Sequence, residues 1–427
     1  MDKKNLTAEE TYVLAVQNQQ KNNFQVAENL YKETLKTNPN HVEAHVNLGI
    51  VFRKLGEHRK AISCYEKAIE INPNHVNVHN NLGIVLQELG ENQKAISCYE
   101  KAIEINPNYA SAYNNLGVVF KELGEDQKAR SFFEKAIKIN PNYAVAHRHL
   151  GEIFRKDKKF RVAADYFKKE DTAFGNAQFL ECTYFSDGVE NYNKLLNIFA
   201  KKDPINLRIA ALAAYVSKKE NIKNIYPFCK NPLNYFFSIN LKDEFKLSDQ
   251  FSNKLLKISE KLESKWQLKP MIIKDGHQST GNLLDIPILE IAELKKKFEK
   301  QISIYRKNYK NSDDYYISRW PTKSELNGWY IKLKQQGQVK SHIHENGWLS
   351  GVFYLKIPKP LKINEGSINL SLQGLDYPYD KSLPNIYYAP KPFDLILYPS
   401  SLFHYTVPFT SNEERHCIAF DVKPKQN

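Results

Sequence analysis

Three histidines in the C-terminal part of this 427-residue chain have a spacing that suits a metal ion. His342 and His344 form the motif His-Ile-His, and His404 directly follows the apolar run 393–403. Side chains alternate between the two faces of a β-strand, so we expect both histidines of the motif to point to one side. With His404 they would form a facial three-ligand site, which leaves the opposite side of the ion open for a bidentate co-substrate and dioxygen.

Arg415 follows His404 along the chain and supplies a group that such a site would use. A guanidinium can bind the far carboxylate of a 2-oxoacid through two parallel hydrogen bonds. The sequence therefore predicts metal ligands at 342, 344 and 404 and a carboxylate-binding residue at 415. Three neutral ligands leave zinc and nickel open beside iron. Glu345 is the alternative carboxylate ligand, although on a regular strand it would point away from the histidines.

Short β runs position these residues. The runs are 329–334, 349–357, 366–372, 393–399 and 415–422, and Pro, Gly, Asn and Asp separate them. Closely spaced strands without intervening helices are typical of a sandwich or barrel. One helix precedes them, and its apolar face is built from Ile291, Leu294, Phe298, Ile302, Tyr305 and Tyr309. We expect residues 266–427 to form a mainly-β jelly roll, a cupin-like double-stranded β-helix.

The first part of the chain is a repeat array. Asn-Pro-Asn occurs at 38–40, 72–74, 106–108 and 140–142, which is a period of 34 residues. Leu-Gly, a small alanine and an aromatic residue recur in phase with it, as close helix packing requires. The array resembles the tetratricopeptide repeat, with about five units over 1–177. Residues 178–265 are expected to be a helical connector that caps this all-α solenoid.

One polar position recurs just before Leu-Gly and is occupied by Asn47, Asn81, Asn115 and His149. Stacked helical hairpins make a concave groove, and side-chain amides there can pair with the backbone of a bound peptide. A similar asparagine ladder is familiar in O-GlcNAc transferases, whose repeats these units resemble. The alternative is that these side chains only cap or solvate the helix face.

Composition limits the class of protein. The net charge is +13, from 61 Lys and Arg against 48 Asp and Glu, and it is spread along the chain. Nucleic-acid binding is therefore not favoured, because its basic residues usually gather in a stripe. No apolar run is long enough for a membrane span, and neither a signal peptide nor a disulfide framework is expected. We expect a cytoplasmic protein, and a homodimer stays open.

The stretches 276–284, 328–358, 365–372, 392–409 and 414–422 together resemble the 2-oxoglutarate/Fe(II) oxygenase family that is found fused to tetratricopeptide repeats. The resemblance implies Fe(II) and 2-oxoglutarate as cofactor and co-substrate, with His342 and His404 as iron ligands. It also implies that Arg415 binds the distal carboxylate and that Tyr354 offers it a phenol. The second ligand of the wider superfamily is usually aspartate, and His344 stands at that position here.

Two functions from different classes follow from these features. The first is a 2-oxoglutarate- and Fe(II)-dependent oxygenase that hydroxylates a protein or peptide recruited by the repeat groove, with a glycan or small molecule as other open substrates. The second is a non-catalytic peptide-binding scaffold whose cupin domain is degenerate or merely stabilised by metal.

Overall fold

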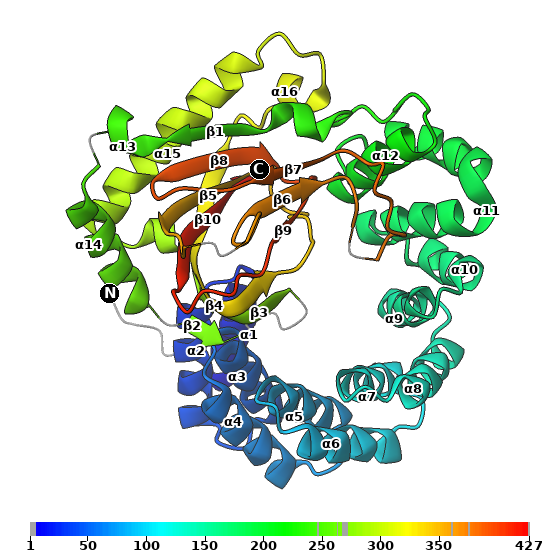
Figure 1. The fold of residues 1–427 in the computed structure, drawn as a ribbon. Helices are drawn as coiled ribbons and strands as arrows, with labels where there is room; N and C mark the ends of the chain where they lie inside the picture. Colours follow the sequence, from blue (N-terminus) through cyan, green and yellow to red (C-terminus); the bar gives the residue numbers. More distant parts are fainter. Residues whose placement is uncertain are drawn as a thin grey trace. The chain divides into compact units, whose positions relative to one another are not determined.

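The computed structural model describes residues 6–425 except 246, 263, 267–271, 360–361 and 375. It divides into two compact units, Met1–Cys182 and Thr183–Asn427. The predicted fold class is confirmed: a helical solenoid is followed by an antiparallel β domain (Figure 1).

The first unit is built from antiparallel helix pairs, one pair for each predicted repeat. The helices are α1 (Ala8–Gln20), α2 (Phe24–Thr37), α3 (Val42–Lys54), α4 (His58–Ile71), α5 (Val76–Glu88), α6 (Asn92–Ile105), α7 (Ala110–Glu122), α8 (Asp126–Ile139), α9 (Ala144–Lys156) and α10 (Phe160–Glu170). Gly83 lets α5 and α6 approach closely, because a Cβ there would lie 2.6 Å from Cε1 of Tyr99. Gly90 begins the turn between them with a φ of +79°, which disfavours other residues.

The chain then passes through α11 (Ala173–Lys202), whose helical backbone is interrupted at Gly188, and through α12 (Leu207–Lys219). The short elements η1 (Pro232–Tyr235), β1 (Phe237–Asn240), α13 (Leu241–Glu244) and α14 (Asp249–Glu260) follow. The sequence predicted a helical connector here. The structure differs at Phe237–Asn240, which pairs antiparallel with β8 of the main sheet. Backbone pairing with a strand that is distant in sequence is not visible in local periodicity.

The second unit holds two antiparallel sheets. The larger has the order β1-β8-β5-β10-β4-β3-β2 and the smaller has the order β7-β6-β9 (Figure 1). The strands are β2 (Ser264–Trp266), β3 (Ile273–Ser279), β4 (Ser324–Val339), β5 (Leu349–Lys356), β6 (Ile368–Ser371), β7 (Asn385–Tyr388), β8 (Asp394–Pro399), β9 (Phe403–Thr406) and β10 (Arg415–Pro424). The five predicted strands correspond to β4, β5, β6, β8 and β10, whereas β2, β3, β7 and β9 were not predicted.

The core of this unit includes residues from both sheets, among them Val352, Ile396 and Ala419 of the larger sheet and Ile368 and Leu370 of the smaller. The predicted helix is α15 (Leu289–Asn308), and the remaining short helices are η2 (Leu283–Asp285) and α16 (Tyr315–Ser318). Phe298 of α15 packs on Phe353 and Phe420 of the large sheet. The helix thus covers the outer face of the sheet, and the inner face is left to line a cavity.

Candidate metal centre

Backbone hydrogen bonds hold the three predicted ligands together. The amides of His342 and His404 each donate to the other's carbonyl oxygen, at 3.2 and 3.1 Å, and the amide of His344 donates to Ser400 at 3.0 Å. The expectation of a regular strand through the motif is wrong. His342 forms a single β-bridge with His404 of β9, and His344 lies in the loop that follows. Residue 344 is positioned by the turn before β9 and not by strand alternation.

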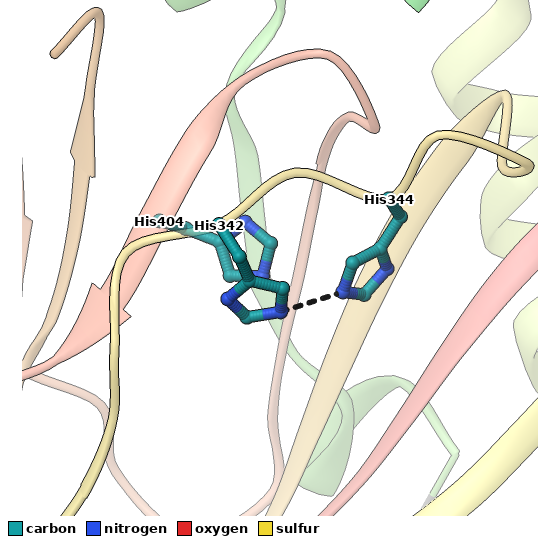
Figure 2. Close-up of side chains that lie close together, drawn as sticks. All are labelled: His342, His344 and His404. Atoms are coloured by element: carbon teal, nitrogen blue, oxygen red, sulfur yellow. Dashed lines mark hydrogen bonds between the residues drawn. The ribbon is translucent and has the colours of Figure 1, made fainter. Parts of the chain in front are cut away.

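The three imidazole rings converge on one point (Figure 2). Their centroids are 4.3 Å apart for His342 and His404, 5.0 Å for His342 and His344, and 4.9 Å for His344 and His404. One ring nitrogen from each residue lies within 4.8 Å of the other two. The structure therefore brings together residues that the sequence separates by up to 62 positions, from 342 to 404.

Hydrogen bonds fix which nitrogen of each ring faces the centre. Nδ1 of His342 lies 2.8 Å from the Lys340 carbonyl oxygen, and Nδ1 of His404 lies 3.2 Å from the Leu402 carbonyl oxygen. Nδ1 of His344 lies 2.6 Å from Oδ1 of Asp421. Carbonyl and carboxylate oxygens only accept, so each Nδ1 is the donor, and in a neutral ring Nε2 then carries the lone pair. This is the arrangement that metal-ligating histidines adopt.

The cluster fits a divalent cation. The Nε2 atoms of His342 and His344 lie 3.0 Å apart, and two lone pairs at that distance need a cation or a shared proton between them. Two nitrogens that each lie about 2.1 Å from one ion at a right angle are about 3.0 Å apart. Burial lowers the pKa of His404 well below its usual value, and the neighbouring His342 and His344 lower it further. A neutral imidazole is the form that binds metal.

Arg415 lines the same cavity as the three histidines, which has a volume of about 600 Å³. The residue is 2% exposed, and its guanidinium lies 4.9 Å from the centroid of the Tyr354 ring. Within the described part of the chain it forms no ion pair, and its Nε has no hydrogen-bond partner. A buried cation without a counter-ion is costly unless an anion joins it, so the residue fits the carboxylate of a co-substrate.

The two tyrosines near Arg415 differ in position. Tyr354 lies against the guanidinium, and its buried hydroxyl has no hydrogen-bond partner among the described residues. It does not line the cavity, whereas Tyr398 of β8 does, with its ring centroid 4.9 Å from that of His404. Tyr398 was not predicted as a residue of the site. Tyr398 and Ile396 are two residues apart on β8 and therefore point to the same face of the sheet. This spacing is the pattern from which its position could have been predicted.

Two carboxylates also differ from expectation. Glu345 forms an ion pair with Arg208 of α12, at 2.6 Å, so the alternative ligand of the sequence analysis is already engaged. Asp421 is the carboxylate that contacts a candidate ligand, and the sequence analysis missed it. The signal was the alternation along β10, because Arg415, Cys417, Ala419 and Asp421 all line the cavity.

The predicted peptide-binding positions occupy equivalent places in α3, α5, α7 and α9 and are half-buried. Asn47 donates to the Tyr12 hydroxyl at 3.0 Å, and Asn115 donates to Asn80 at 2.9 Å. The His149 ring stacks on Phe133, with centroids 4.8 Å apart. The amide of Asn81 has no hydrogen-bond partner within the described residues. Part of the column thus joins adjacent repeats, and Asn81 keeps its full hydrogen-bonding capacity.

Comparison with known proteins finds family matches for a segment of each part of the chain. Residues 40–108 and 74–142 match the family described as "Tetratricopeptide repeat", and residues 327–421 match the family described as "Putative 2OG-Fe(II) oxygenase". No curated protein matches the chain.

Two similar solved structures illustrate the extent of the likeness. The structure described as "Crystal structure of MamA" is 31% identical and covers 36% of this chain and 91% of that chain, with a TM-score of 0.33. The structure of PilF from Pseudomonas aeruginosa is 20% identical and covers 48% of this chain and 96% of that chain, with a TM-score of 0.42. Of the helices that the structure describes, none combines the length and the apolar character of a membrane span.

Proposed function

Because the chain joins tetratricopeptide repeats to a domain of the 2OG-Fe(II) oxygenase family, we propose that it is a 2-oxoglutarate- and Fe(II)-dependent hydroxylase of a protein or peptide that the repeats bind. The observation that carries this proposal is a single cavity lined by three convergent imidazoles and by a buried arginine without a counter-ion. A metal ligand set and a carboxylate partner in one enclosure are the two requirements of this chemistry.

Each residue has a defined task in this proposal. His342, His344 and His404 hold the iron through Nε2, and the acceptors at their Nδ1 atoms keep the rings in place. Arg415 binds the distal carboxylate of 2-oxoglutarate, and Ile331, Val352 and Ile368 are apolar residues that line the same cavity. Bound together, the iron and the co-substrate supply the oxidising power for hydroxylation of a C–H bond.

The cavity also has room for a substrate side chain. Trp329, Asn327, Thr280 and Lys423 line it in addition to the residues that hold the metal and co-substrate. A volume of about 600 Å³ is within the range of sites that enclose a drug-sized ligand. Tetratricopeptide arrays generally bind proteins or peptides in their groove, which supports a polypeptide substrate.

The test is release of succinate from 2-oxoglutarate by the full chain with Fe(II) and ascorbate, measured by proton NMR. We expect His404→Ala to lower the rate at least 100-fold, because it removes one of three metal ligands. His277→Ala is the matched control, since His277 lies on β3 and does not line the cavity. It should leave the rate within twofold of the wild type.

A wild-type rate equal to that of His404→Ala would refute the oxygenase. The non-catalytic peptide-binding scaffold would then be the better description, because three neutral ligands without a coordinating carboxylate also suit a metal that only stabilises the fold.

A further inference from the structure

Asp421 of β10 is a buried carboxylate in contact with one of the three candidate metal ligands. It is 5% exposed, and its Oδ1 accepts from Nδ1 of His344 at 2.6 Å and from the Ser350 hydroxyl at 2.8 Å. Ser350 is in turn 2.8 Å from the hydroxyl of Ser400, in the turn before β9. Among the described residues, His344 is the only group with which Asp421 can form an ion pair. These contacts join the carboxylate directly to the candidate metal centre.

The charge of the centre makes this contact important. Three neutral imidazoles leave both charges of a divalent ion uncompensated, whereas a set of two histidines and one carboxylate neutralises one of them. Excess charge in an enclosed site is costly, and so is a buried carboxylate without a cation. We propose that Asp421, acting through His344, supplies the negative charge that the three-histidine ligand set lacks. The inference rests on the metal centre of the proposed function.

A comparison within the centre supports the proposal. His342 and His404 each donate Nδ1–H to a neutral backbone carbonyl oxygen, which is enough to orient a ring. Of the three acceptors at Nδ1 that the described residues provide, that of His344 is a carboxylate, and a second donor, Ser350, also contacts this carboxylate. A negative acceptor at Nδ1 raises the electron density that Nε2 offers to the metal. Asp421 is thus a positioning residue that also strengthens one ligand.

The test uses Asp421→Asn, which keeps the size of the side chain and its acceptor oxygen but removes the charge. We expect its dissociation constant for Co²⁺, followed by the visible absorption of the bound ion under anaerobic conditions, to rise 10- to 100-fold. Asp394→Asn is the matched control, because Asp394 is an equally buried carboxylate of the same sheet whose partners include Asn240 and Tyr388 and, among the described residues, none of the three histidines. It should change the constant less than threefold. Asp421→Ser is the second variant, and it should lose affinity as Asp421→Asn does.

A double variant tests whether the negative charge of Asp421, and not its shape, is what the metal centre needs. In the double variant His344→Asp, Asp421→Asn the carboxylate moves into the ligand set, so we expect Co²⁺ affinity within threefold of the wild type. The inference is wrong if Asp421→Asn binds Co²⁺ within twofold of the wild type, or if the double variant binds no better than Asp421→Asn. A wild-type protein that binds no Co²⁺ at millimolar concentration would refute the proposed metal centre itself. The two failures are therefore distinguishable.

Discussion

Replacement of Arg415 by methionine tests two effects of the buried guanidinium: its effect on the free energy of unfolding and its part in binding 2-oxoglutarate. Arg415 is 2% exposed and forms no ion pair with the described residues; its Nη1 donates to Sγ of Cys417 at 3.6 Å, and its guanidinium lies 4.9 Å from the centroid of the Tyr354 ring. Such a cation–π contact is worth up to about 2 kcal/mol. Replacement of a buried ion pair by apolar side chains of similar volume is neutral or stabilises by about 1–4 kcal/mol, and a buried cation without a counter-ion has no Coulombic attraction to lose. We expect Arg415→Met to gain stability within this range when 2-oxoglutarate is absent.

The same substitution should abolish stabilisation by the co-substrate. At 100 times its dissociation constant a ligand stabilises the folded state by about 2.7 kcal/mol, and each kcal/mol raises the midpoint of a 150–250-residue unit by about 2–4 °C. The wild type with Mn²⁺ in place of iron should therefore gain about 5–10 °C from 2-oxoglutarate. The variant should gain less than 1 °C. Differential scanning calorimetry, with and without 2-oxoglutarate, measures both effects on the transition of the β domain.

Arg306→Met is the matched control for this prediction. Arg306 is also stacked on an aromatic ring, 5.2 Å from the centroid of Trp320, but it is exposed on α15. Its replacement should change the stability by less than about 1 kcal/mol and preserve the full effect of 2-oxoglutarate. If Arg415→Met is less stable than the wild type and 2-oxoglutarate still stabilises it, the guanidinium is structural and the assignment of the carboxylate site is wrong.

Two further predictions concern other parts of the chain. Burial lowers the pKa of His416 to about 4, although Glu414 opposes the shift, so the unfolded chain takes up a proton near pH 6.5 while the folded chain does not. The free energy of unfolding should therefore fall by about 3 kcal/mol between pH 6.5 and 4. In urea unfolding, His416→Gln should not show this loss. Equal pH dependence in both proteins would contradict the prediction. In the repeats, Asn81→Ala should lower hydroxylation of protein substrates, detected as a 16 Da mass increase in a digested proteome, and leave succinate release without substrate unchanged. Undiminished hydroxylation would show that this amide does not bind the substrate.

The sequence by itself determined the solenoid, because its contacts are local and periodic. The close approach of Gly83 to Tyr99 joins residues of one helix pair, and the same spacing recurs at Gly117 and Phe133. The strand that begins at Arg415 was also predictable, since alternation and turn residues define a strand without knowledge of its partner. The short strand β9, which carries His404, was not predicted. The motif His-Ile-His with a later histidine and arginine was enough to predict the members of the site.

Tertiary structure alone decided how these residues are used. Periodicity shows which face of a strand is buried but not which strand lies beside it, so the pairing of β1 with β8 could not be predicted. For the same reason the partners of Glu345 and Asp421 could not be predicted: the first pairs with Arg208 and the second with His344. Burial of a charge is decided by the partner that compensates it, and that partner is chosen by packing between distant segments.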